Sequence, residues 1–303
     1  MSQIKELKVA CFGEVLWDLF PGREKKAGGA PFNVTYHLSR LGLDAQIISA
    51  VGNDDLGDEL LNQLRNWNIP IDSIQINKEQ PTSTVVATLD KNNDAHYDIL
   101  APVAWDFIEL NNFSKQLVAN ADALVFGSLA TRNELSRNTL FSLLECSQLL
   151  VFDINIRQPY FHLPTVEYLL KKSHIVKFNK AELHLLLESL SKHYNTDQEK
   201  ISFIQDRYNL EEIIVSNGAL GACYVTKNGL YDFPAKEVTV ADTVGSGDAF
   251  LAGFLSKRLS GEFDETEIMN EAISLGAFVT THHGACPNYT LKEFYDFKLA
   301  INN

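Results

Sequence analysis

The segment 242–248, Asp-Thr-Val-Gly-Ser-Gly-Asp, places two glycines, two hydroxyls and two carboxylates directly before a long apolar run. Glycines in such a turn expose backbone N–H groups, and at the start of a helix these groups and the helix dipole hold an anion. Asp248 would lie beside that anion. A carboxylate that accepts a hydroxyl proton next to an anion hole suits phosphoryl transfer. The alternative is a glycine-rich turn with Asp248 as a helix cap.

A second glycine pair, Gly28-Gly29, precedes Ala30-Pro31-Phe32-Asn33. The glycines let the backbone approach a ligand, Pro31 suits a first helical position, and Asn33 can offer its amide to hydroxyl groups. Alone, this segment is equally typical of a loop that leads into a capped helix.

Asn179 and Glu182 follow an apolar run and have the spacing of a capping box at the start of a helix. Other signatures are absent from the sequence: there is no P-loop, no dinucleotide-binding GxGxxG after the first strand, no GxSxG and no HExxH. His282 and His283 are adjacent, and adjacent histidines rarely bind one zinc ion.

Short apolar runs alternate with stretches of helical periodicity, and elements of these two kinds must position the motifs. The alternation predicts an α/β fold with a mostly parallel sheet and helices on both faces. Strands are expected at 9–12, 47–51, 123–126, 149–154, 175–178 and 213–215. Helices are expected at 32–41, 56–67, 135–146, 165–172, 181–190, 199–208, 248–259 and 265–281.

Two stretches break this alternation. Residues 84–89 and 95–99 flank the polar sequence 90–94, which indicates a β-hairpin. Residues 15–26 are also non-helical and contain Pro21-Gly22. We expect 15–26 and 82–100 to form a small β lid over the carboxyl edge of the main sheet, within a single domain that spans 1–303.

Composition excludes several classes of protein. With 303 residues, of which 45% are hydrophobic and 21% charged, the chain is typical of a folded globular protein. Its net charge of −13 argues against a nucleic-acid or membrane partner. The 4 cysteines lie far apart, which predicts reduced thiols. Charges near the N-terminus argue against a signal peptide, and no apolar segment would span a membrane, so we expect a soluble, cytoplasmic protein.

The motifs occur in an order that resembles the ribokinase-like (PfkB-type) carbohydrate kinases, and most of all a fructokinase. The resemblance runs from end to end and rests on 13–18, 28–33, 103–106, 153–157, 179–182 and, most specifically, 242–248. Ser246 stands where that family more often has alanine. The resemblance implies a ribokinase-like α/β fold with a small β-sheet lid. It also implies transfer of a phosphoryl group from ATP to a primary hydroxyl of a small sugar.

The resemblance also implies roles for individual residues. The catalytic base would be Asp248, and the anion hole would consist of Gly245, Ser246 and Gly247. Sugar-binding positions would be Asp18, Gly28, Gly29, Asn33 and Arg157. ATP and its Mg²⁺ would be held by Asn179, Glu182, Ser216, Gly218 and Gly221. A monovalent cation such as K⁺ would be held, mostly by backbone carbonyls, at Asp242, Val244, Val279, His282, Gly284 and Asn288.

Asp248 would lie beside a helix N-terminus, so we expect its pKa to be low. A weak base suffices in a loose transition state, because the proton can transfer late.

Fructose is the expected acceptor; ribose, 2-keto-3-deoxygluconate and a nucleoside are alternatives within the family. A non-catalytic sugar-binding regulator is the alternative from another class. The intact Asp248, glycine turn and Asn179–Glu182 pair argue against it, because a pure binder needs none of them. Exposed lid strands suggest a homodimer that pairs edge to edge.

Overall fold

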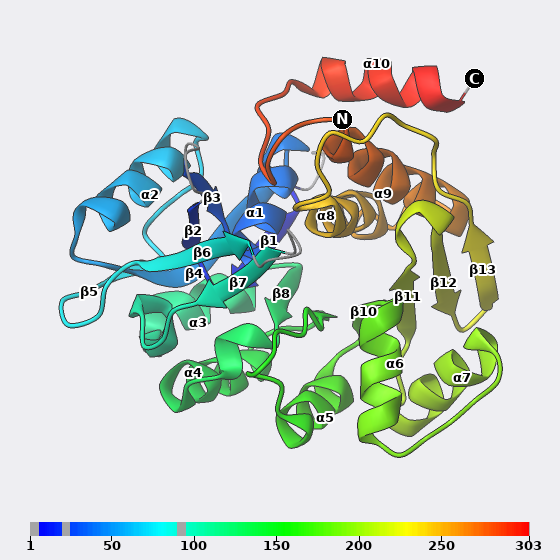
Figure 1. Ribbon diagram of the computed structural model, residues 1–303, viewed down its shortest axis with the longest axis horizontal. Coiled ribbons are helices and arrows are strands. Elements are labelled where there is room, and N and C mark those ends of the chain that lie inside the picture. Colours follow the sequence, from blue (N-terminus) through cyan, green and yellow to red (C-terminus); the bar gives the residue numbers. More distant parts are fainter. Residues whose placement is uncertain (1–5, 20–24, 90–94, 303) are drawn as a thin grey trace.

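Parallel pairing of apolar strands builds a large sheet at the centre of the computed structural model, which describes residues 6–19, 25–89 and 95–302. Within these residues the strand order is β13-β12-β11-β10-β9-β8-β1-β4-β5 (Figure 1). The parallel strands are β1 (Lys8–Phe12), β4 (Asp44–Gly52), β5 (Ile74–Asn77), β8 (Ala123–Gly127), β9 (Leu150–Asp153), β10 (Ile175–Asn179) and β11 (Glu212–Ser216). Two antiparallel strands, β12 (Ala222–Thr226) and β13 (Gly229–Phe233), complete one edge.

Helices cover both faces of this sheet, as its almost continuous hydrophobicity predicts. Alternate residues of β1 show the two faces: Val9 and Cys11 belong to one hydrophobic core, whereas Ala10 and Phe12 belong to the other. The first core includes α1 (Ala30–Arg40), α2 (Asp55–Asn66), α8 (Ser246–Arg258), α9 (Glu265–Thr280) and α10 (Leu291–Asn302). The second includes α3 (Asn112–Asn120), α4 (Glu134–Leu144), α5 (Leu163–Lys172), α6 (Lys180–Ser189) and α7 (Asp197–Tyr208), which lie below the strands in Figure 1.

A smaller, separate sheet has the strand order β3-β2-β6-β7. Its strands are β2 (Leu16–Leu19), β3 (Lys26–Gly28), β6 (Ser83–Leu89) and β7 (Ala95–Ile99). β6 and β7 pair antiparallel, which confirms the expected hairpin, while its connection at 90–94 lies outside the described residues, as does 20–24. β3 extends to Gly28, so this sheet carries one of the glycines of the second motif.

Helices α8 and α9 approach each other closely at two glycines. A Cβ on Gly253 would lie 3.0 Å from both the Ala272 Cα and the Glu271 carbonyl oxygen, and one on Gly276 would lie 3.2 Å from the Ser246 carbonyl oxygen. Separations below about 3.4 Å force a neighbour to move, so the glycines allow the close contact. The start of α8, which carries the glycine turn, is therefore fixed against α9.

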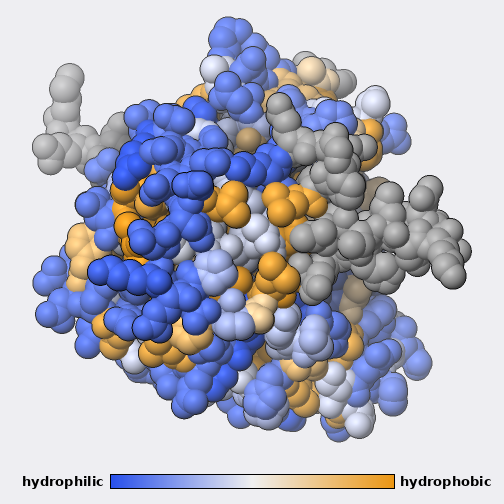
Figure 2. Space-filling view, turned by 60° about the vertical axis from the view of Figure 1, so that its left-hand side comes forward, coloured by the Kyte–Doolittle hydropathy of each residue, from blue (hydrophilic) through white to orange (hydrophobic). Residues whose placement is uncertain are grey.

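The predicted mostly parallel α/β fold is confirmed, and each expected strand and helix is present with bounds that shift by a few residues. Short 3₁₀ helices connect some elements: η1 (Ala104–Phe107), η2 (Leu129–Thr131) and η3 (Gly218–Leu220). The 4 cysteines are free thiols. Among the described residues, no helix has both the length and the apolar character that crossing a membrane requires. Figure 2 shows one face of the molecule, where hydrophobic residues form small separate groups on a mostly hydrophilic surface.

Candidate active site

The glycine turn starts α8. Gly245 is the N-cap residue, with a φ of 75°, a left-handed conformation that glycine adopts without strain. A side chain there would overlap Ala285 of the loop after α9. Asp242 holds the same turn, because one carboxylate oxygen accepts from the Val244 N–H at 3.1 Å and the other from the Gly284 N–H at 3.0 Å. The first N–H groups of α8 are thereby placed at a fixed position, as an anion hole requires.

The second glycine motif meets the first one through a single hydrogen bond. Asn33, in the first turn of α1, donates from Nδ2 to Oδ2 of Asp248 at 2.7 Å, across 215 positions of the chain. Gly29 is the N-cap of α1 with a φ of 113°, and a Cβ there would overlap the Glu14 carbonyl oxygen. Glu14 in turn accepts from the Ala30 N–H at 3.3 Å. Both predicted helix starts therefore face one another.

The pKa of Asp248 differs from the value expected from the sequence. Burial of the carboxylate raises the pKa to about 7, and the negative charge of Asp153 adds to this rise. The hydrogen bond from Asn33 and the positive charges of Lys177 and Arg157 oppose it. The expectation of a low pKa was wrong, because desolvation and Asp153 outweigh the helix N-terminus. A carboxylate with a pKa near neutrality suits a general base.

A buried ion pair that sequence reasoning missed lies beside Asp248. Asp153 at the end of β9 and Lys177 on β10 are neighbours in register, and Lys177 Nζ lies 2.9 and 2.8 Å from the two Asp153 oxygens. Burial alone would lower the pKa of Lys177, but Asp153 and Glu182 outweigh it and raise the pKa. The Lys177 ammonium also lies 3.6 Å from where a Gly247 Cβ would be, so its charge sits next to the glycine turn.

Asn179 and Glu182 form the predicted capping box at the start of α6. Asn179 Oδ1 accepts from the Glu182 N–H at 2.8 Å, and Glu182 Oε2 accepts from the Asn179 N–H at 2.8 Å. The other Glu182 oxygen accepts from the Ile156 N–H at 3.0 Å. Burial and the charge of Asp153 raise the pKa of Glu182. The Glu182 carboxylate therefore lies close to the ion pair of Asp153 and Lys177.

The remaining predicted sugar-binding residues lie around the same helix start. Asp18 and Gly28 are on adjacent strands of the small sheet, and a Cβ on Gly28 would lie 2.8 Å from an Asp18 carboxylate oxygen. Burial raises the pKa of Asp18 to about 6. Arg157 is exposed, and its charge acts on both Glu14 and Asp248. Of the five predicted sugar-binding positions, Asn33 bonds to Asp248, Gly29 begins the helix that carries Asn33, and the charge of Arg157 acts on Asp248.

A cavity of about 490 Å³ opens on the other side of the glycine turn. Ser216, Gly218 and Gly221 line it, together with Ser246 and Gly247 of the turn. Asn179 is the register neighbour of Ser216, so it lies at the same carboxyl edge of the sheet. Sequence reasoning missed the apolar and loop residues that complete the lining: Ala219, Ala235, Lys236, Glu237, Val238, Val240, Thr243, Phe250, Ile273, Gly276, Ala277 and Thr280. Their sequence does not indicate a binding site, because these residues are apolar, small or in an irregular loop.

The predicted cation-binding segments meet only in part. Asp242 bonds to Val244 and Gly284, which unites three of the six residues. The Val279 carbonyl accepts from the His282 N–H at 2.9 Å at the end of α9. Asn288 lies farther along the loop, where its Oδ1 accepts from Arg40 of α1 at 3.2 Å. Among the described residues, no three His, Cys, Asp or Glu side chains could together hold a metal ion.

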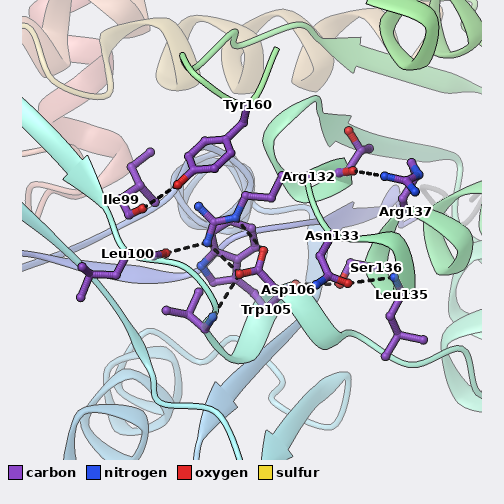
Figure 3. A network of polar contacts seen from close by, with 12 residues as sticks. Ile99, Leu100, Trp105, Asp106, Arg132, Asn133, Leu135, Ser136, Arg137 and Tyr160 are labelled. Atoms are coloured by element: carbon purple, nitrogen blue, oxygen red, sulfur yellow. Dashed lines mark hydrogen bonds and ion pairs between the residues drawn. The ribbon is translucent and has the colours of Figure 1, made fainter. Parts of the chain in front are cut away.

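A polar network holds the carboxyl end of β7, where the small sheet joins the main body (Figure 3). Arg132 forms a buried ion pair with Asp106, with Nε 2.6 Å from Oδ1. Its guanidinium lies between the Trp105 and Tyr160 rings, 4.0 and 4.6 Å from their centroids, and it donates to the Leu100 carbonyl at 2.7 Å. The Tyr160 hydroxyl donates to the neighbouring Ile99 carbonyl at 3.1 Å. Sequence reasoning missed Arg132 and Tyr160, since neither belongs to a motif.

The large, mostly parallel sheet, the glycine turn at the start of α8 and the cavity beside that turn define an α/β protein with a candidate ligand site. The profile of the family described as "pfkB family carbohydrate kinase" matches residues 7–291, so the chain belongs to that family. The protein is therefore a phosphotransferase that acts on a sugar.

Individual relatives agree with this assignment. The chain is 28% identical over 296 residues to the fructokinase of Salmonella typhimurium, an alignment that covers 92% of this chain and 94% of that protein. A fructokinase from Vibrio cholerae, solved with fructose, ADP and calcium bound, is 25% identical with a TM-score of 0.83 and covers 96% of this chain and 98% of that one. An ATP-bound fructokinase from Xylella fastidiosa shares the fold, with a TM-score of 0.88 at 22% identity over 98% of this chain and 99% of that one.

Proposed function

We propose that the protein is an ATP-dependent kinase that phosphorylates a primary hydroxyl of a small sugar, with fructose as the preferred acceptor. The hydrogen bond between Asn33 and Asp248 carries this proposal, because it joins the predicted sugar-binding helix start to the predicted base and anion hole. Fructose is favoured over the other acceptors because relatives that match most of the chain are named fructokinases.

In this proposal the sugar lies between the small sheet and α1, held by Asp18, Gly28, Gly29, Asn33 and Arg157. Its hydroxyl attacks the terminal phosphoryl group of ATP, and Asp248 accepts the proton. With a pKa near 7, Asp248 is ionised in a large fraction of molecules at neutral pH and is a stronger base than an ordinary aspartate.

The backbone N–H groups of Gly245, Ser246 and Gly247 would take up the charge that develops on the transferred group. Lys177 lies beside this turn and adds a fixed positive charge. ATP would occupy the adjacent 490 Å³ cavity, which Ser216, Gly218 and Gly221 line. Its apolar lining suits an adenine ring, and phosphates that reached its end at the glycine turn would lie near Asp248.

The residues present also fit Mg²⁺, which in kinases is held by one or two carboxylates, substrate phosphates and water. Burial, and then the negative charge of Asp153, raise the pKa of Glu182 despite the opposing charge of Lys177, and a bound cation would favour the ionised carboxylate. Glu182 and Asn179 would hold the ion through water, because their side chains already bond to backbone N–H groups. Bound Mg²⁺ would neutralise charge on the phosphates.

A monovalent cation, K⁺ rather than Na⁺, would bind where Asp242 meets Val244 and Gly284. Asp242 supplies negative charge there, and the loop carbonyls around Gly284 supply oxygen ligands. The cation would stabilise the turn and would make the electrostatic potential near the phosphates more positive. Closure of the small sheet over the sugar would exclude water and limit hydrolysis of ATP.

A coupled assay of ADP release tests the proposal with fructose, ribose, 2-keto-3-deoxygluconate and adenosine, each in potassium and in sodium chloride at equal ionic strength. We expect Mg²⁺-dependent turnover with the highest kcat/KM for fructose and higher rates in potassium. A tenfold lead for another acceptor, about 1.4 kcal/mol in transition-state binding, would contradict the choice of fructose. Equal rates in the two salts would contradict the cation site.

A further inference from the structure

Both ends of the Asn33 side-chain amide are held in the candidate site. Its nitrogen donates to Asp248, and its oxygen accepts from the Cys286 thiol, with Sγ 3.3 Å from Oδ1. An ionised carboxylate can only accept a hydrogen bond, so Asp248 requires the amide nitrogen on its side, and the amide oxygen is left to accept from the thiol. A flip that turned the amide oxygen toward Asp248 would break both of these hydrogen bonds.

The position of Cys286 is set by its neighbours in the loop after α9. His37 of α1 bonds through Nε2 to the Ala285 carbonyl at 2.9 Å, and the Tyr36 hydroxyl donates to the Pro287 carbonyl at 2.5 Å. These buried side chains fix the backbone on both sides of Cys286, so the weak thiol hydrogen bond does not have to place the loop. The loop backbone therefore holds the Cys286 side chain next to Asn33.

We propose that Cys286 is a positioning residue for the phosphoryl transfer, whose S–H group holds the Asn33 amide with its N–H toward Asp248. This inference rests on the proposed role of Asp248 as the base. A flipped amide would accept a hydrogen bond from a protonated Asp248, and would thereby stabilise the inactive, protonated form. The thiol disfavours that state.

Other groups also act on Asp248: Asp153 from β9, Lys177 from β10 and Arg157 from the segment after β9. None of them changes when Cys286 is replaced. A change in the ionisation of Asp248 in a Cys286 variant therefore reports on the amide between them.

The first test compares Cys286→Ala, which removes the donor, with Cys286→Ser, which supplies a hydroxyl donor of similar size. We expect the acid limb of kcat/KM against pH to move to higher pH by about half a unit in Cys286→Ala. Cys286→Ser should return it toward the wild-type position. Cys146→Ala is the matched control, since Cys146 bonds to the Ser142 carbonyl on α4, away from the site.

The second test needs no turnover. The titration of Asp248 is followed by ¹³C NMR in protein labelled at aspartate Cγ, and its signal is assigned by its loss in Asp248→Asn. The same shift of about half a unit is expected between wild type and Cys286→Ala. Equal titration of Asp248 in these two proteins would overturn the inference, whether or not any sugar is phosphorylated. An equal shift in Cys286→Ser and Cys286→Ala would also overturn it.

Discussion

Asp248 is the residue on which the proposed chemistry most directly depends. We predict that Asp248→Asn lowers kcat by at least about a hundredfold, because general bases contribute roughly 10²–10⁴-fold. KM should change much less, since the lost interaction belongs mainly to the transition state. The two side chains are nearly the same size, so packing around α8 should persist. Steady-state kinetics, with melting temperatures measured with and without ADP, would check both expectations.

Asp264→Asn provides the matched control for this prediction. Asp264 also stands at a helix start, where it caps α9 by accepting from the Glu267 N–H at 2.9 Å, but it lies outside the candidate site. It should leave kcat close to that of the wild type. If Asp248→Asn retained more than about a tenth of the wild-type kcat, Asp248 would not be the base.

Individual residues were predictable where a motif marked them and not where the fold created their surroundings. Gly245 and Asn33 stood out because glycine turns before apolar runs are rare and have a mechanism. The raised pKa of Asp248 depends on burial and on Asp153, which is 95 positions away in the sequence, so it could not be read from the turn. Lys177 interrupts an apolar strand, and only its register with Asp153 explains its burial.

At the scale of elements, the network around Arg132 holds the carboxyl end of β7 on the main body. We predict that Arg132→Met lowers the free energy of unfolding by about 3–5 kcal/mol, because it leaves the buried Asp106 carboxylate unpaired. Tyr160→Phe should cost only about 1 kcal/mol, since it removes a single hydrogen bond to the Ile99 carbonyl. Urea denaturation at neutral pH would measure both.

The exposed pair of Arg207 and Glu167 offers the comparison. Their side chains are 40% and 23% exposed, whereas those of Arg132 and Asp106 are 4% and 2% exposed. Arg207→Met should therefore cost less than about 1 kcal/mol. Losses of equal size in Arg132→Met and Arg207→Met would show that the network does not anchor the small sheet.

Elements with strong hydrophobic patterns were predictable, and those at edges were not. Strands such as β9 and β10 read as continuous apolar runs because both faces are covered. β13 is mostly exposed and β5 alternates only weakly, so their sequences resemble loops. Helix α10 covers one end of the first core, and sequence reasoning missed it although Thr290 and Glu293 form a capping box at its start. The homodimer through the small sheet stays a prediction, for which β3 and β7 provide the open edges.

For the molecule as a whole, buried carboxyl groups link stability to pH. Burial raises the pKa of Glu14 from 4.5 to about 7, and its Oε2 has no hydrogen-bond partner among the described residues. A carboxyl whose pKa is higher in the folded state binds more protons when folded, so its stabilising contribution is lost as pH rises toward 7. We predict that Glu14→Gln, which cannot ionise, loses this dependence.

The measurement is urea denaturation of wild type and Glu14→Gln at pH 5 and pH 8. The free energy of unfolding of Glu14→Gln, minus that of the wild type, should be about 2 kcal/mol higher at pH 8 than at pH 5. Glu199→Gln is a suitable comparison, because backbone and side-chain hydrogen bonds from Thr196 lower the pKa of Glu199. The difference in the free energy of unfolding between Glu199→Gln and the wild type should stay constant from pH 5 to pH 8. A constant difference for Glu14→Gln would contradict the raised pKa.

The hydrogen bond between Asn33 and Asp248 also bears on how the protein is made. During translation the N-terminal part of a chain folds first, and α1 is among the earliest helices to leave the ribosome. Asp248 follows 215 residues after Asn33, and the loop that holds Cys286 follows later still. A nascent or prematurely terminated chain therefore presents one half of the site without the other. Under the proposed function, catalytic competence therefore arises only after the ribosome has synthesised the loop that holds Cys286.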